Sequence, residues 1–264
     1  MNAHQNSISA AGKTFSVLNG EIRGMLSAGH KKIIVNDMCG QRYLADGLRG
    51  ENISLVINGT PGNDLAAFLD GPEVVVFGNA QEGIGNTMNA GQVIIHGNAG
   101  DIAGHSMRGG RIFIKGNAGY RVGIHMKAYK NLFPVVIIGG CAGAFLGEYM
   151  AGGLLIVLGL SGKDSGRPKP AFLQEHIDDT RIIGDFAGTG MHGGQIFIRG
   201  EIAGCYLGRE VKTGSPSSDD IKLLTRHLND FCGYFELDIN EILKIPFVKL
   251  YPYSHRPYGR LYAY

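Results

Sequence analysis

The stretch "GNAGDIAGHSMRGGRIFIKGNAG", residues 97–119, begins and ends with the same four residues, and its two copies of GNAG lie 19 residues apart. Glycine loses more backbone entropy on folding than any other residue. A segment this rich in glycine therefore uses the positive φ or the close backbone approach that glycine alone permits. Self-similarity at a fixed short interval is typical of solenoid proteins. The fold depends on how far this repeat extends.

The repeat continues on both sides of the quoted stretch and forms about seven units between Leu55 and Gly208. Each unit has aliphatic residues four and two positions before its reference glycine, and such alternation predicts one short strand per unit. The strands are expected to stack in parallel on their copies. The two aliphatic columns are Leu55, Val74, Val93, Ile112, Val136, Leu155 and Ile196, and Ile57, Val76, Ile95, Ile114, Ile138, Val157 and Ile198.

Two further columns follow the same register. Glycines recur at the expected corners of each coil, and a column of mainly methionine is expected to stack inside the solenoid. Since parallel strand connections are nearly always right-handed, the sequence predicts a mainly β protein, a right-handed parallel β-helix of about seven coils. The structural glycines are Gly78, Gly85, Gly97, Gly104, Gly116, Gly123, Gly140, Gly147, Gly188 and Gly200, and the interior column is Leu69, Met88, Met107, Met126, Met150 and Met191.

The segments outside the repeat predict a cap at each end. Residues 1–53 are expected to form a small α/β cap, with a helix near 20–28 and a strand through 33–35, before the glycine repeat at 54–210. Residues 211–264 are expected to hold a helix and a tail. Apolar residues at helical spacing (Ile221, Leu224, Leu228 and Phe231) follow a Ser- and Asp-rich helix start. Insertions at 127–134 and 162–180 interrupt the period, and insertions in repeats often lie on a binding face.

Composition restricts the classes of function. The chain has 264 residues, 18% of them charged, with a net charge of +2 and no basic block, so nucleic-acid binding is not expected. The first twenty residues lack the apolar core of a signal peptide, and no stretch has the 18 or so apolar residues of a membrane span, so a cytoplasmic location is expected. The four cysteines are far apart and are expected to be reduced and mostly buried.

No catalytic or metal-binding constellation is evident in the repeat. His96, His105, His125 and His192 stand at different offsets in their units, so stacking is not expected to gather them into one column. The stretch GTGMHG at 188–193 matches a dinucleotide-binding pattern, but a strand rather than a helix is expected after it. We therefore expect no catalytic residue, cofactor or metal in this chain.

One outward column has the character of an interface. Three positions before each reference glycine, where a strand side chain faces away from the core, the residues are aliphatic or aromatic. Continuous apolar runs are typical of parallel strands that are buried on both faces. Either the termini of the chain cover this column or a partner protein does. The candidate interface residues are Val75, Ile94, Phe113, Ile137, Ile156 and Phe197.

Glycine repeats of this form, preceded by CGQRYLADGL at residues 39–48, resemble the GXGXG domain at the carboxyl end of the glutamate synthase large chain. The same repeat family includes one of the subunits of formylmethanofuran dehydrogenase. The resemblance covers residues 20–210, and the segment at 39–48 favours the glutamate synthase branch. It implies a β-helix scaffold that holds a glutaminase part and an FMN-containing synthase part, with FMN and an iron–sulfur cluster on partner chains.

The sequence also departs from the full large chain. Asn2 follows Met1 where the amino-terminal cysteine nucleophile would be, and the cysteines form no cluster for an iron–sulfur centre. The leading hypothesis is therefore a non-catalytic scaffold subunit of a glutamate-synthase-like oxidoreductase. The alternatives are a scaffold subunit of a molybdenum or tungsten formylmethanofuran dehydrogenase, an independent β-helix enzyme such as a polysaccharide-cleaving one, and a solenoid that pairs with its own copy.

Overall fold

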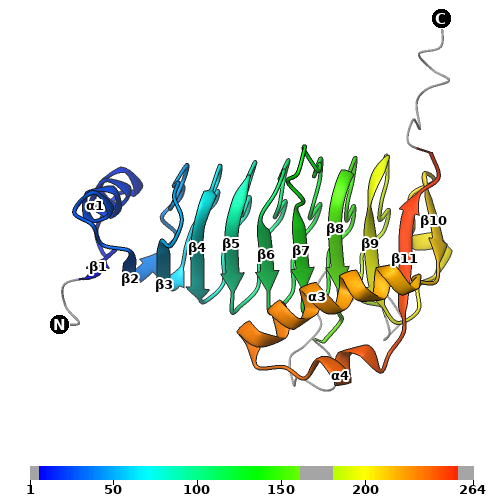
Figure 1. The fold of residues 1–264 in the computed structure, drawn as a ribbon. Helices are drawn as coiled ribbons and strands as arrows, with labels where there is room; N and C mark the ends of the chain where they lie inside the picture. The colour runs from blue at the N-terminus through cyan, green and yellow to red at the C-terminus, as the bar shows by residue number, and fades with distance from the viewer. Residues whose placement is uncertain (1–5, 161–180, 255–264) are drawn as a thin grey trace, which may run out of the picture.

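The structure, a computed structural model, describes residues 6–160 and 181–254. The protein is a β-solenoid, and the eleven strands within these described residues form one sheet in the order β1-β2-β3-β4-β5-β6-β7-β8-β9-β11-β10 (Figure 1). The first nine strands pair in parallel and in chain order, which confirms the predicted stacking of one strand per coil. The strands are β1 (Ser7–Ser9), β2 (Lys32–Cys39), β3 (Ser54–Thr60), β4 (Asp70–Phe77), β5 (Ala90–Ile95), β6 (Arg111–Ile114), β7 (Val135–Ile138), β8 (Ala151–Val157), β9 (Gly193–Arg199), β10 (Val211–Gly214) and β11 (Phe247–Pro252).

The register of the sheet is the one that the repeat predicts. Leu55 is paired with Val74, and the same column continues from coil to coil as far as Ile196. The seven predicted strands are β3 to β9, joined by six turns of the solenoid. Both aliphatic columns and the methionine column lie in the interior, and Met88, Met107 and their successors have no exposed surface. Stacked apolar columns thus form the core along the whole axis.

The glycines of the repeat have two different structural roles. At Gly116 the φ angle is not positive, but a Cβ atom would lie 2.7 Å from the carbonyl oxygen of Gly97 in the preceding coil. Gly123 has a φ of +72°, and a Cβ there would lie 2.9 Å from both δ carbons of Leu155 inside the solenoid. The first position needs close backbone approach and the second needs both positive φ and the absence of a side chain.

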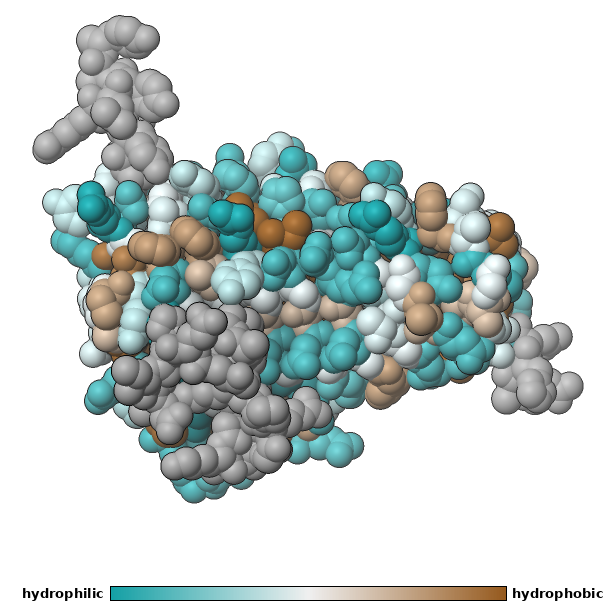
Figure 2. All heavy atoms as spheres, turned by 180° about the vertical axis from the view of Figure 1, so that it is seen from behind, coloured by the Kyte–Doolittle hydropathy of each residue, from teal (hydrophilic) through white to brown (hydrophobic). Residues whose placement is uncertain are grey.

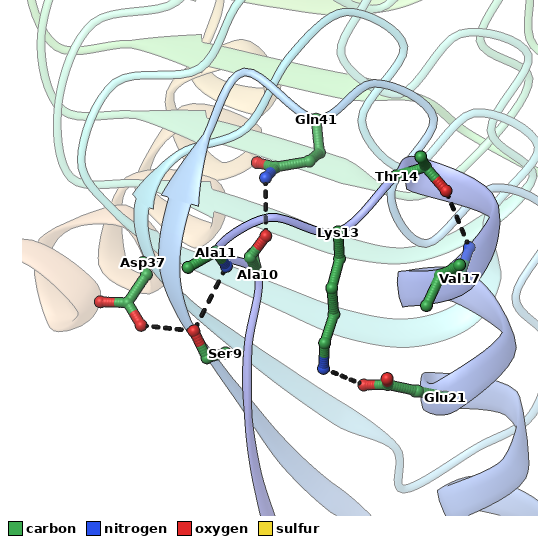
Figure 3. Close-up of polar contacts among 9 residues, drawn as sticks. All are labelled: Ser9, Ala10, Ala11, Lys13, Thr14, Val17, Glu21, Asp37 and Gln41. Carbon is green, nitrogen blue, oxygen red and sulfur yellow. Dashed lines mark hydrogen bonds and ion pairs between the residues drawn. The ribbon is translucent and has the colours of Figure 1, made fainter.

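The N-terminal cap covers the first coil with helix α1 (Phe15–Ser27) and strand β1. The helix begins five residues earlier than the predicted start at Gly20, because Thr14 is its N-cap and accepts a hydrogen bond from the Val17 N–H (Figure 3). The Gln41 side chain donates to the Ala10 carbonyl at 2.9 Å and ties this cap to the coil (Figure 3). The cap therefore closes the end of the interior core.

The C-terminal segment does more than the sequence predicted. The short 3-10 helix η2 (Gly204–Tyr206) precedes this segment. The segment itself contains helices α3 (Ser218–Phe235) and α4 (Ile239–Leu243). Its strands β10 and β11 were not predicted, and β11 pairs antiparallel with β9, so strands from all three predicted segments belong to one sheet. The insertion at 162–180 lies outside the described residues.

Candidate protein-interaction surface

The outward apolar column that the sequence singled out is covered by the chain itself. Helix α3 runs across the strands on this face (Figure 1). Its apolar side forms a second core with the sheet through Leu224, Leu228 and Phe231, which have no exposed surface. Five of the six candidate interface residues, Ile94, Phe113, Ile137, Ile156 and Phe197, are 0% exposed, and Val75 is partly buried at the edge of the same cluster.

This burial decides between the two alternatives that the sequence left open. The amphipathic C-terminal helix is long enough to cover the column, and Phe113 contacts Phe231 with ring centroids 6.2 Å apart. The expectation that these residues offer a surface to another protein is corrected, because their outward faces are already buried within the chain. A surface for a partner must lie elsewhere.

Polar contacts hold α3 in place at both ends. Near its start, Lys249 on β11 donates to both carboxylate oxygens of Asp220 at 2.8 Å, and Asp220 also accepts from the Ser217 backbone N–H and side chain in a capping box. Near its end, the Tyr234 hydroxyl donates to Glu73 at 3.0 Å. Burial raises the pKa of Tyr234, and the negative charge of the nearby Glu73 carboxylate raises it further, to about 12. The hydroxyl therefore keeps its proton. The helix is thus an integral part of the fold.

A different set of side chains, three aromatic and three polar or charged, lies at the turns that precede the strands. We call Arg121, His125, Phe145, Glu148, Tyr149 and Phe186 the turn patch. Phe145 and Phe186 stack with ring centroids 5.2 Å apart, and His125 stacks on Tyr149 at 5.3 Å. The Arg121 guanidinium lies 5.0 Å from the Phe145 ring centroid and donates to Glu148 at 2.9 Å. Phe186 remains 51% exposed.

The turn patch holds bulky side chains in a backbone conformation that disfavours them. Phe145 and Phe186 have φ angles of 61° and 62°, and Tyr149 has 52°. The left-handed region costs a non-glycine residue about 1–2 kcal/mol. The same two positions have positive φ in the other coils as well, and glycine fills each of them only once. The equivalent residues are Asp64, Gly83, Ile102 and Arg121 for the two phenylalanines, and Phe68, Thr87, Ser106, His125 and Gly190 for the tyrosine. The left-handed turn is therefore a regular feature of the repeat, and the turn patch is distinguished by the aromatic rings that stack on one another there.

Two of the four histidines that the sequence singled out lie close together on the turn face. His105 and His125 have ring centroids 6.2 Å apart, although their offsets in the repeat differ by one residue. Stacked coils bring such neighbouring outward positions together. Burial and the proximity of His125 lower the pKa of His105. Within residues 6–160 and 181–254, no three histidine, cysteine or acidic side chains converge in a way that could hold a metal ion.

The sequence reasoning overlooked an asparagine ladder within the GNAG motif. The Asn98 N–H donates to the Asn79 side-chain oxygen at 2.8 Å, and the Asn117 N–H donates to Asn98 at 2.9 Å. The Cys141 N–H closes the series by donating to Asn117 at 2.8 Å. The signal was available, since these asparagines recur every 19 residues directly after the reference glycine. The ladder links adjacent coils and has a structural role.

The surface seen from the opposite side shows how apolar residues are distributed. Figure 2 shows a face that is mostly hydrophilic, with hydrophobic residues in several separate groups. No helix in the described part of the chain is long and apolar enough to cross a bilayer.

Comparison with known proteins gives two matches. A family model described as the GXGXG motif matches residues 30–244, which include the end of the cap, all the coils and helices α3 and α4. An uncharacterized protein of Methanocaldococcus jannaschii is 42% identical over 236 residues, which is 88% of this chain and 86% of the relative.

Proposed function

The chain belongs to the GXGXG motif family, the family of a domain of the glutamate synthase large chain, and from this premise we propose that it is a non-catalytic scaffold subunit of a glutamate-synthase-like oxidoreductase. The observation that carries the proposal is the family match over residues 30–244, which spans the solenoid and the helix that covers it. The proposed partners are a glutaminase-like chain and an FMN-containing synthase-like chain. FMN and an iron–sulfur cluster would reside on those chains.

The shape of the protein suits this role. A solenoid whose coils are joined by parallel strands, stacked methionines and an asparagine ladder presents the same backbone geometry over many coils. Such elongated repeat surfaces are typical binding platforms. Because α3 covers the sheet face, we assign partner binding to the turn patch. Its exposed aromatic rings and an arginine are the residue types enriched at protein interfaces.

The first test is capture of the tagged full-length chain from its native lysate, with identification of the co-purifying chains and an absorption spectrum of the eluate. We expect a flavin spectrum together with glutaminase-like and synthase-like chains. A pterin-containing eluate would instead favour the formylmethanofuran dehydrogenase alternative. A colourless eluate that contains this chain alone, eluting as an oligomer in gel filtration, would favour self-association.

A pair of matched variants tests the assignment to the turn patch. Phe186→Gly removes an aromatic ring that is 51% exposed in the patch, whereas Phe77→Ala removes one that is 52% exposed at the end of β4. We expect the first variant to capture much less of the partner chains and the second to capture the wild-type amount. Equal capture by both variants, with both folded, would place the interface elsewhere.

A further inference from the structure

A groove runs along one side of α3, between the helix and the start of strands β4 to β6. Its walls include Glu73 and Gln92 from the sheet and Arg226 and His227 from α3. Residues 131–133, from the insertion at 127–134, form part of the rim. The insertion thus lies beside a hollow, as insertions in repeat proteins often do at binding faces. We call this hollow the insertion groove.

The acceptors of the insertion groove are already occupied by donors of the chain. The Glu73 carboxylate accepts hydrogen bonds from Gln92 at 2.8 Å, from Tyr234 at 3.0 Å and from Ser54 at 3.4 Å. On the same sheet wall, Arg111 at the start of β6 forms an ion pair with Asp230 of α3. The Glu73 carboxylate is therefore satisfied locally, and Asp230 balances the charge of Arg111.

Several donors of the same groove remain unused. The exposed Arg226 side chain forms no hydrogen bond or ion pair with any residue that the structure describes, and the same holds for the side-chain amide of Asn89. His227 is only 8% exposed, and its Nδ1 atom is buried without a hydrogen-bond partner among the described residues. Buried polar groups are nearly always paired, so an unpaired imidazole beside a hollow is a specific signal.

The two nitrogens of His227 differ in their surroundings. Nδ1 is buried and has no partner among the described residues, whereas Nε2 is not fully buried. The imidazole ring lines the groove. Burying an unpaired N–H is rarer than burying an unpaired acceptor. The favoured neutral tautomer therefore carries its proton on Nε2, which is then a donor toward the groove.

We propose that the insertion groove binds a small anion, a carboxylate or a phosphate group, through the Arg226 guanidinium, the His227 Nε2–H and the Asn89 amide. Each of these three groups lacks a partner among the described residues and offers an N–H donor, and two of the three lie on α3. Arginine pairs well with carboxylate and phosphate oxygens because its N–H groups match their geometry. The proposal rests on the groove alone and does not depend on the proposed function.

The charges around His227 support an anion over a cation. Burial lowers the pKa of His227, and the positive charges of Arg226 and Arg111 lower it further, whereas Asp230 acts in the opposite direction. The imidazole thus lies in a positive local field. Glu73 keeps its negative charge when it accepts hydrogen bonds from neutral donors, and Glu51 lies at the exposed outer rim, so we assign the anion to the α3 side of the groove, beside Arg226.

The test is a titration of the isolated full-length chain, with its histidine rings labelled for NMR, against inorganic phosphate and separately against glutarate. We expect the His227 ring signal to shift and saturate with at least one anion, while His30 and His192 serve as internal references. Arg226→Gln should weaken binding at least about tenfold, which corresponds to about 1.4 kcal/mol, the low end for a hydrogen bond to a charged group. Lys244→Gln, which removes the same charge at the C-cap of α4, should leave binding unchanged.

The two anions separate the possible sources of the ligand chemistry. Saturation by phosphate alone indicates a phosphate-bearing ligand, and saturation by glutarate alone indicates a carboxylate-bearing one. The proposal is overturned if neither anion shifts the His227 signal in a saturable way. It is also overturned if Arg226→Gln binds the anion as tightly as the control Lys244→Gln and the wild-type chain do. The titration contains no partner protein, so its failure does not bear on the scaffold proposal. Failure of the lysate capture likewise does not bear on the anion site in the insertion groove.

Discussion

The sheet face and the turn face of the solenoid both carry large apolar side chains, but the chain treats them in opposite ways. On the sheet face, Phe113 and Phe197 sit in relaxed strands and are 0% exposed beneath α3. On the turn face, Phe186 is 51% exposed and is held at a φ of 62°. The first face gains stability from its apolar residues, whereas the second accepts backbone strain with little burial in return.

This contrast shows which kind of apolar column signals a partner. Apolar residues in a relaxed, continuous strand column are explained by folding, because any amphipathic element of the same chain can cover them. Aromatic residues that stay exposed on the turns are not explained in this way. The predictions that follow test the two halves of this contrast, from the largest expected loss of stability to the smallest.

Phe231→Ala tests the sheet face most directly. Phe231 has no exposed surface and contacts Phe113 and Phe235, with ring centroids 6.2 Å and 4.7 Å away. Truncating a buried phenylalanine costs about 3–5 kcal/mol. Urea unfolding should show this loss, while Ile221→Ala on the exposed side of the same helix should change stability by less than about 0.5 kcal/mol. A loss below about 1 kcal/mol for Phe231→Ala would mean that α3 is only loosely associated with the sheet.

Asp220→Ala tests the attachment of α3 by charge. Asp220 is 8% exposed at its side chain and is ion-paired with Lys249 at 2.8 Å. Removing one member of a buried pair costs about 3 kcal/mol. Burial alone would raise the pKa of Asp220. Hydrogen bonds from Lys249 and Ser217 outweigh burial and lower this pKa below its usual value.

The pH dependence of this effect has a definite sign. Because the folded-state pKa is depressed, the stabilisation is present above the unfolded-state pKa of about 4. It is lost as the pH falls through the lower, folded-state value. The stability difference between Asp220→Ala and the wild type should therefore be full at pH 7 and shrink below about pH 4. A difference that stays constant down to about pH 2 would contradict this account.

Gly123→Ala tests the interior that lies beneath the turn face. Its φ of +72° disfavours a side chain by about 1–2 kcal/mol, and the new Cβ would lie 2.9 Å from Leu155. We expect a total loss of about 2–3 kcal/mol once overpacking is included. Gly24→Ala in α1, where no atom lies within 4 Å, should instead be neutral or slightly stabilising. Equal behaviour of the two variants would show that the glycine columns are not required.

Most of the fold could be predicted from the sequence because stacking makes the fold periodic. Residues that share an offset share an environment, so the columns of Val74 and Met88 and their strand register were readable directly. The chain ends lie outside this periodicity. Helix α1 started early because one capping residue, Thr14, decides its boundary, and β11 was missed because its antiparallel pairing with β9 has no counterpart in the repeat.

The functional surfaces were harder to predict, for a physical reason. The offset in the repeat tells whether a side chain points inward or outward, but it does not tell what covers an outward residue such as Ile137. The partner of that residue comes from a helix about ninety positions later in the chain. The turn patch could not be predicted from the sequence because its members differ from coil to coil. The positive φ at Phe186 is a property of the backbone conformation, which the sequence does not give.

Phe186→Gly tests the turn face and should have the smallest effect on stability. Relief of the left-handed strain gains about 1–2 kcal/mol. It is offset by the loss of the stacking contact with Phe145, about 0.5–1.5 kcal/mol, and by the greater freedom of glycine in the unfolded chain, about 0.5–1 kcal/mol. The three contributions nearly cancel, so the urea midpoint should stay close to that of the wild type, as Gly83 at the equivalent position indicates. A loss of more than about 2 kcal/mol would make the turn patch a folding element like the sheet face, and the contrast between the two faces would no longer identify a partner surface.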